Sequence, residues 1–123
     1  MRITKIHLFN FRSVDDLTLD CSVDGLHAIT GRFGAGKSSF FTGVRFALFG
    51  DTGDAGTNLD LRRRGCDDAE EAGCEVTFTH GQDTYVARRW MRRHTTKRGP
   101  SEKVSASLSI NGAAVDGMGA RTL

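Results

Sequence analysis

Hydrophobic and polar residues alternate along the N-terminal part of the chain in the manner of strands. Residues 3–11 (ITKIHLFNF) are rich in β-branched and aromatic side chains, and residues 14–20 (VDDLTLD) place Leu17 and Leu19 two positions apart. Residues 26–30 (LHAIT) are a third short apolar run. This pattern predicts three strands, with a short connection between the first two.

A helical spacing of apolar residues follows. Within residues 38–50 (SSFFTGVRFALFG), one helical face is formed by Phe40, Val44, Ala47 and Leu48. Gly50 stands where a glycine commonly ends a helix. Residues 51–72 mix glycine and charge without a sustained period, so they predict a long loop with at most a turn of helix.

Alternation returns in the second half of the chain and indicates antiparallel hairpins. Apolar residues alternate in 74–79, residues 80–83 supply a turn, and residues 84–92 run back. Residues 104–110 alternate again, and the Asn-Gly pair at 111–112 favours a tight hairpin turn. The second half therefore predicts a layer of antiparallel strands.

Between the third predicted strand and the helix, residues 31–38 read GRFGAGKS and fit the pattern G-x-x-x-x-G-K-[ST] in full. Glycines let backbone N–H groups point at phosphates, and the helix that follows directs its positive dipole end to the same place. The lysine should reach the β and γ phosphates, and the serine hydroxyl should bind Mg²⁺. The expected contacts to ATP are Gly31, Phe33, Gly34, Ala35, Gly36, Lys37, Ser38 and Ser39, with Ser38 also the metal ligand.

Length and composition limit the rest. The 123 residues are 38% hydrophobic and 26% charged, which allows one modest core. No stretch approaches the roughly 18 apolar residues of a membrane-spanning helix, and no signal-peptide core is present, so we expect a cytoplasmic protein without a membrane partner. The three cysteines lack C-x-x-C spacing and the four histidines are scattered, which favours structural roles over metal ligation.

Charge is distributed unevenly. Residues 1–84 contain 9 basic and 13 acidic side chains, whereas residues 85–123 contain 8 and 2. Six of these basic residues fall within eleven positions: Arg88, Arg89, Arg92, Arg93, Lys97 and Arg98. Such a strip can neutralise DNA phosphates without sequence preference. A solvated edge strand, whose charges block unwanted strand pairing, explains it equally well.

The run KIHLFNFRS, the loop GxxGAGKSS and the segment FALFG resemble the start of the SbcC family of double-strand-break repair ATPases, which are relatives of the SMC and RecF proteins. LRRRG at 61–65 and the hairpin at 76–89 extend the resemblance over essentially the whole chain. It implies an α/β P-loop NTPase head of the ABC/SMC type, whose N-terminal lobe has a mixed sheet, the P-loop helix and an antiparallel hairpin layer. It also implies an ATP-dependent head dimer, an SbcD-type nuclease partner, and a role on DNA ends in repair and recombination.

Further site residues follow from this resemblance. Arg12 and Ser13 would approach the phosphates from the preceding loop, which suits the fork of a guanidinium. Arg62, Arg63 and Arg64 would lie near the adenine, largely through their backbone. The alternatives are an exposed turn arginine and a solvated loop. Where the family usually has asparagine, this chain has Phe33, whose side chain cannot hydrogen-bond a phosphate.

Hydrolysis needs an acidic residue for Mg²⁺ and a group that orients water. No run of four apolar residues ends in Asp, and the single glutamine, Gln82, falls in a predicted turn. In the SbcC family the glutamine loop, signature motif and Walker B strand come later, so residues 1–123 resemble a partial head without a catalytic residue. We expect an isolated chain of this kind to hydrolyse ATP negligibly, although the full assembly would be an ATPase.

Three other functions remain open. The chain resembles a RecF-like repair ATPase almost as well, because the NFRS segment separates the two families poorly. An ABC-transporter-type ATPase is disfavoured by the same segment. The third is a nucleic-acid-binding module whose P-loop is vestigial, and ATP binding would separate it from a repair ATPase.

Overall fold

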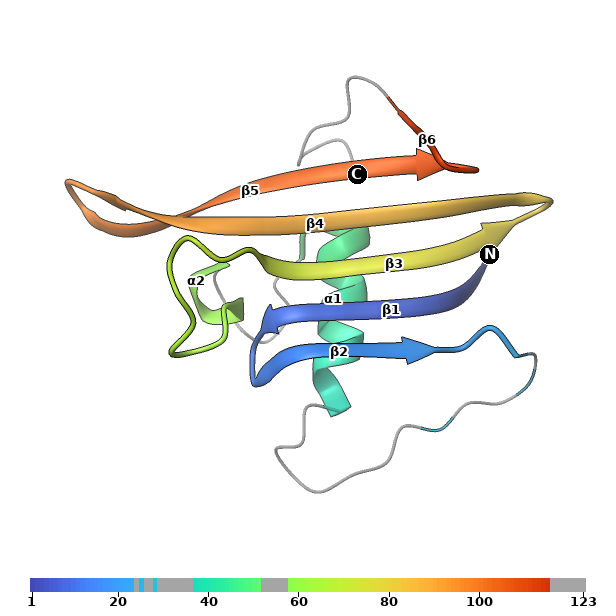
Figure 1. Cartoon of the computed structure of the whole chain (residues 1–123), viewed down its shortest axis with the longest axis horizontal. Helices are drawn as coiled ribbons and strands as arrows, with labels where there is room; N and C mark the ends of the chain where they lie inside the picture. The colour runs from blue at the N-terminus through green and yellow to red at the C-terminus, as the bar shows by residue number, and fades with distance from the viewer. Residues whose placement is uncertain (24, 26–27, 29–36, 52–57, 116–123) are drawn as a thin grey trace.

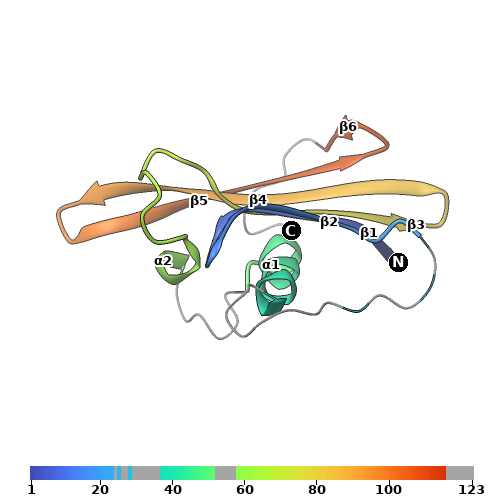
Figure 2. The same cartoon turned by 60° about the horizontal axis from the view of Figure 1, so that its bottom comes forward.

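A computed structural model describes residues 1–23, 25, 28, 37–51 and 58–115. Six strands form one sheet in the order β2-β1-β3-β4-β5-β6, and the two helices lie on the same face of it (Figures 1 and 2). The elements are β1 (Arg2–Phe11), β2 (Val14–Asp20), α1 (Lys37–Phe49), α2 (Asn58–Leu61), β3 (Ala72–His80), β4 (Asp83–Thr96), β5 (Gly99–Ile110) and β6 (Ala113–Ala114).

The core lies between α1 and the sheet. β1 directs Ile6 and Leu8 toward the helix, in agreement with its alternating pattern. α1 crosses the strands and packs on β1, β3 and β4. The remaining buried apolar side chains of this core include Phe11, Val14, Phe40, Phe46, Ala47, Leu61, Cys74, Val76 and Met91. This packing sets the orientation of α1 relative to β1, β3 and β4.

The helix predicted at 38–50 is confirmed. Gly50 has φ +72° and its N–H donates to the carbonyl of Phe46 over 2.8 Å, which ends α1 as expected. Gly43 faces the sheet, because a Cβ at this position would lie 2.5 Å from Leu8 Cδ2. Phe46 is 1% exposed and occupies the centre of the buried face, although it was not among the residues predicted there.

Both N-terminal strands and the downstream hairpins are also confirmed. The Asn-Gly turn joins β5 to β6, with φ +52° at Asn111 and +86° at Gly112, the signs that a type I′ turn requires. The third predicted strand, residues 26–30, and the phosphate loop at 31–36 lie outside the described residues apart from Ala28. The predicted loop at 51–72 contains α2.

The described part of the sheet differs from the predicted arrangement. All pairings among the described strands are antiparallel, whereas the mixed sheet that was expected included the strand at 26–30, which lies outside the described residues apart from Ala28. The hairpin β3–β4 does not form a separate layer, because β3 pairs with β1 and joins both hairpins in one sheet. Alternation identifies a strand and its buried face, but it carries no information about which strand lies beside it.

The β4–β5 hairpin extends past the other strands. β3 begins at Ala72 opposite Met91, whereas the β4–β5 register continues to Thr96 opposite Gly99. Residues 92–103 therefore form a two-stranded projection, which we call the arm (Figure 1). The arm carries five Lys or Arg residues and one acidic residue, Glu102.

Candidate functional site

The first turn of α1 follows the phosphate-loop motif directly. The helix begins at Lys37, whose side chain lies outside the description, as do Gly31, Phe33, Gly34, Ala35 and Gly36. Ser38 is exposed and Ser39 is 2% exposed. An accessible hydroxyl in the first turn of a helix has the chemistry of a Mg²⁺ ligand that shares the ion with phosphate oxygens, so Ser38 fits that role.

Arg12 reaches α1 from the β1–β2 turn. Arg12 and Ser13 are the two turn residues between the paired Phe11 and Val14, and Arg12 has φ +55°. Its Nη1 donates to Thr42 Oγ1 over 3.1 Å. Thr42 lies four residues after Ser38 and therefore on the same side of the helix, so the guanidinium stands beside the N-terminal turns of α1.

The arginine segment at 62–64 is held against the same turn. The N–H of Arg12 donates to the carbonyl of Leu61 over 2.6 Å, and the N–H of Arg63 donates to the carbonyl of Asn10 over 2.8 Å. Phe11 and Arg62 form an isolated antiparallel bridge, and Arg63 Nε donates to Asn10 Oδ1 over 3.2 Å. Two segments about fifty positions apart are thereby joined as a short strand pair.

A hollow of about 460 Å³ opens where these segments meet. It is lined by Arg12, Ser13, Asp60, Arg62, Arg63 and Arg64. Five of the residues predicted to contact the nucleotide therefore border one cavity. An arginine-rich wall of this kind favours an anionic ligand.

The three consecutive arginines have different environments. Arg64 is exposed, whereas the Arg62 side chain is 1% exposed and pairs with Glu102 on β5, which is also 1% exposed. Burial alone lowers the pKa of Arg62, but hydrogen bonds to Glu102 and Cys66 and their charges raise it above its ordinary value. The side chain of Arg62 is therefore part of the interior.

The predicted basic strip is divided between the two faces of β4. Arg89 points toward α1 and is 2% exposed, and its guanidinium carbon lies 3.4 Å from where a Cβ at Gly50 would be. A cation at the last turn of a helix is favourable, and burial lowers the pKa of Arg89. Arg89 is thus enclosed in this chain and is not available to a phosphate at the surface.

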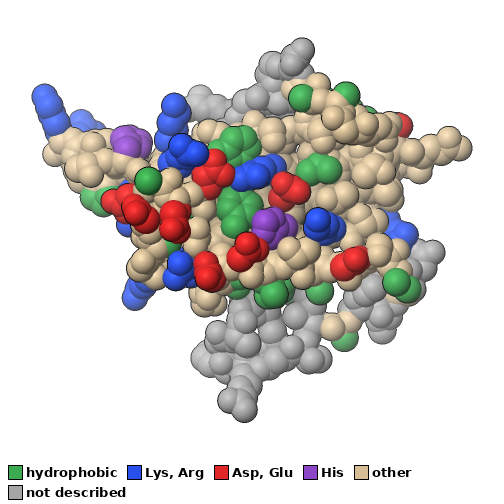
Figure 3. Space-filling view, in the orientation of Figure 1, with side chains coloured by type: hydrophobic (Ala, Val, Ile, Leu, Met, Phe, Trp, Pro, Cys, Tyr) green, Lys and Arg blue, Asp and Glu red, His purple; other side chains and the backbone are tan. Residues whose placement is uncertain are grey.

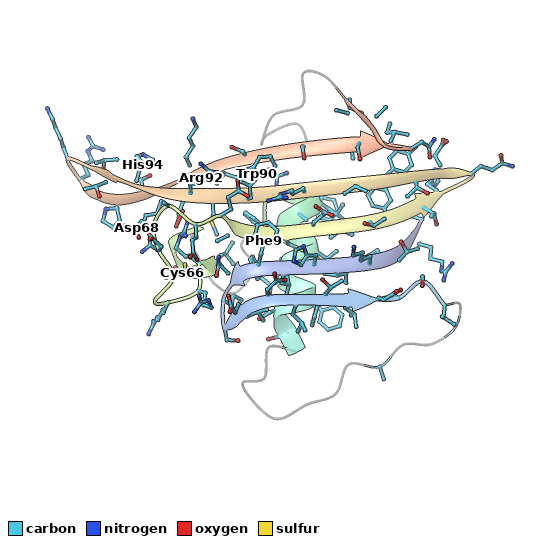
Figure 4. All side chains as sticks on the ribbon, in the orientation of Figure 1. Phe9, Cys66, Asp68, Trp90, Arg92 and His94 are labelled. Carbon is cyan, nitrogen blue, oxygen red and sulfur yellow. The ribbon has the colours of Figure 1, made fainter. Side chains whose placement is uncertain are left out.

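Arg92 lies on the opposite, open face of the sheet, where basic and acidic side chains are intermingled (Figures 3 and 4). Arg88 lies four residues earlier in β4 and therefore faces the same side. Both donate to Glu71, over 2.6 and 2.9 Å respectively. The guanidinium of Arg88 also lies over the rings of Phe9 and Trp90, at 4.7 and 5.0 Å from their centroids. Arg88 is therefore engaged within the chain.

The charges of the arm are accessible at its tip but not at its base. Near the base, Arg93 is shared between Glu102, at 3.2 Å, and Asp68, at 3.9 Å. Lys97 and Arg98 are exposed in the β4–β5 turn, and within the described part of the chain their side chains form no ion pair or hydrogen bond. These two residues are the members of the strip best placed for a polyanion.

Several residues that contact or line the candidate site were not predicted from the sequence. Thr42 and Asn10 contact the predicted arginines, and Asp60 lines the hollow. The sequence offered one clue to Glu102: it is the one acidic residue of the basic arm, within an alternating strand.

Among the described residues, no helix is long and apolar enough to cross a membrane.

Comparison with known proteins identifies the family of this chain. The family model of the AAA domain matches residues 5–119. The DNA double-strand break repair Rad50 ATPase of Thermoplasma acidophilum is 36% identical over 115 residues, which cover 94% of this chain and 12% of that protein. The proteins of the same name from Methanococcus maripaludis and Sulfolobus acidocaldarius are 33% and 36% identical, over 78% and 70% of this chain.

The chain spans about a tenth of the length of these relatives, which is 12%, 9% and 9% in the three cases. The matches confirm the resemblance to SbcC-type repair ATPases that the N-terminal run and the phosphate loop predicted. The chain therefore belongs to the AAA domain family, and within it is similar to the N-terminal part of Rad50- and SbcC-type ATPases of double-strand break repair.

Proposed function

We propose that this chain is the ATP-binding N-terminal lobe of a repair ATPase that acts on DNA double-strand breaks with a nuclease partner of the SbcD type. The observation that supports it most directly is the position of Arg12, which donates to Thr42 on α1 and is tied through its N–H to residue 61. This arrangement gathers the NFRS turn and the arginine segment at one cavity, and the Arg12 guanidinium links that cavity to α1.

In this proposal the triphosphate lies at the N terminus of α1. Residues 31–36 and Lys37 would bind its phosphates, Ser38 would bind Mg²⁺ between them, and the guanidinium of Arg12 would add a charge-assisted contact. Backbone groups of residues 62–64 would border the base. The Mg²⁺ would neutralise phosphate charge, while the chain's own contribution is to hold and orient the nucleotide.

The whole assembly would need further parts. A second head and the remaining half of the same head would supply the groups that activate water, and DNA would bind the arm. Because the chain has no predicted Walker B acidic residue, the isolated chain is expected to hydrolyse ATP negligibly. Turnover by purified chain that disappears on Lys37→Ala would contradict this part of the proposal.

ATP binding tests the proposal directly. Titration of the purified chain with a fluorescent ATP analogue and Mg²⁺ should show saturable binding, and Lys37→Ala should abolish it because the β and γ phosphates lose their cation. Lys5→Ala is the matched control, because it removes the same charge at an exposed position of β1. A wild-type chain that is folded and does not bind the analogue would favour a vestigial P-loop instead.

A further inference from the structure

Glu102 joins the arm to the wall of the candidate nucleotide site. Its carboxylate accepts from Arg62 through both oxygens, with Nε to Oε1 at 2.5 Å and Nη2 to Oε2 at 3.1 Å. Arg93 on β4 donates to the same Oε1 over 3.2 Å. The Glu102 side chain is 1% exposed, so water does not screen these contacts.

The remaining donors of Arg62 bind the surrounding backbone and Cys66 Sγ, to which Nη1 donates over 3.5 Å. Nη1 donates to the carbonyls of Glu70, at 2.8 Å, and Asp67, at 3.3 Å. Nη2 also donates to the carbonyl of Met91 on β4, at 3.1 Å. One guanidinium thus fixes the segment at 62–64 relative to β4, β5 and the loop that precedes β3.

The segment fixed in this way is the one that lines the hollow. The backbone of Arg62 bridges Phe11, and the neighbouring residues hydrogen-bond to Arg12 and Asn10 on the β1–β2 turn. Displacement of the Arg62 side chain would therefore shift residues 62–64 together with the turn that carries Arg12. Glu102 itself does not line the hollow.

We infer that Glu102 is a positioning residue for the nucleotide site, acting through Arg62 to set the location of residues 62–64 and Arg12. This inference rests on the proposed function. It makes nucleotide affinity depend on a carboxylate in the base of the arm, about forty residues after the segment that it positions. Since both partners are buried, neutralising either one leaves an uncompensated charge and obliges the segment to move.

The test compares Glu102→Gln with Glu71→Gln. Glu71 also holds two arginines, Arg88 and Arg92, but on the open face of the sheet. Under conditions where circular dichroism shows both variants folded, affinity for the fluorescent ATP analogue should fall about fivefold or more in Glu102→Gln. The affinity should stay at the wild-type value in Glu71→Gln, because the ion pairs that this substitution removes involve Arg88 and Arg92, which do not line the hollow.

Amide hydrogen exchange gives a readout that general destabilisation would not reproduce. Exchange at residues 11–13 and 61–64 should accelerate in Glu102→Gln relative to the other strands, and should be unchanged in Glu71→Gln. If Glu102→Gln does not fold, the double variant Arg62→Met with Glu102→Leu replaces the pair by apolar groups of similar size, which buried pairs often tolerate. That variant should fold and show the same loss of affinity and protection.

The outcomes separate the two proposals. Wild-type affinity and wild-type exchange at residues 61–64, in whichever of these variants folds, would overturn the positioning role. If the wild-type chain binds no nucleotide, the proposed function fails. In that case faster exchange confined to residues 11–13 and 61–64 still supports positioning by Glu102, and unchanged exchange still overturns it.

Discussion

Cys74 illustrates how one side chain acquires its chemistry from its surroundings. It is fully buried beneath α1, and its Sγ lies 3.1 Å from where a Cβ at Gly43 would be. Burial, followed by the charge of Glu75, raises the pKa of the thiol from 9.0 to about 12. The sequence predicted a reduced, structural cysteine, and the structure gives all three described cysteines as free.

Folding stability should therefore fall in alkaline solution. The folded thiol keeps its proton between pH 9 and about 12, whereas the unfolded thiol loses it. The stabilisation is complete below pH 9 and is lost as pH rises toward 12, by a few kcal/mol at most as an order of magnitude. Urea unfolding from pH 8 to 11 should show a decline that Cys74→Ala reduces and the control Cys66→Ala retains. Parallel curves for wild type and Cys74→Ala would contradict this assignment.

At the scale of elements, the β1–β2 turn performs two tasks at once. It connects two strands with Arg12 at φ +55°, a conformation in which a non-glycine residue is disfavoured by roughly 1–2 kcal/mol. It also brings the Arg12 guanidinium to Thr42. The need for a long cation at this position offers a physical reason why glycine does not occupy the turn.

Arg12→Gly should separate these tasks. Glycine adopts the turn without strain, and its greater freedom in the unfolded chain offsets much of that gain, so stability should change by no more than about 1–2 kcal/mol. Nucleotide affinity should fall about tenfold or more because a charge-assisted hydrogen bond to phosphate is lost. Asn111→Gly, at φ +52° in the remote β5–β6 turn, is the control. Equal affinities for Arg12→Gly and wild type would remove Arg12 from the site.

The strands show which predictions are local. Residues 3–11, 14–20 and the hairpins were predicted correctly because alternation, turn residues and β-branched side chains act over a few positions. The pairing of β1 with β3 joins residues about seventy positions apart, and no short-range pattern specifies it. The same limitation hid the contacts of Thr42 and Glu102 with the predicted arginines.

Across the whole molecule, charge is sorted by position. The arm, whose turn carries Lys97 and Arg98, extends past the other strands at one end of the sheet (Figure 1). The candidate hollow is lined in part by Arg62, which pairs with Glu102 in the base of the arm. Arg88, Arg89 and Arg93 belong to the same basic run, but they are engaged by acidic or aromatic partners or enclosed beneath the sheet. Only part of the run therefore presents charge to a partner.

Reversing the charge at the arm tip should weaken DNA binding uniformly across sequences. In Lys97→Glu with Arg98→Glu, the slope of log affinity against log salt concentration should decrease by about 2, since each phosphate contact to duplex DNA contributes about 0.9. The control is Arg2→Glu with Lys5→Glu, which makes the same charge change in the first half of β1, away from the arm. An unchanged slope in the arm variant, measured by fluorescence anisotropy on a short duplex, would indicate a solvated hairpin end.

The sequence alone determined the P-loop motif, the order of the described strands and α1, and the family, because each depends on residues that are contiguous or regularly spaced. Tertiary structure decided that Arg12 and residues 62–64 share a cavity, that Arg62 and Arg89 are interior, and that Glu102 connects the arm to the cavity wall. These properties arise when strands distant in sequence pair and enclose side chains. Whether a given arginine binds a ligand or a buried carboxylate is therefore fixed only by the assembled sheet.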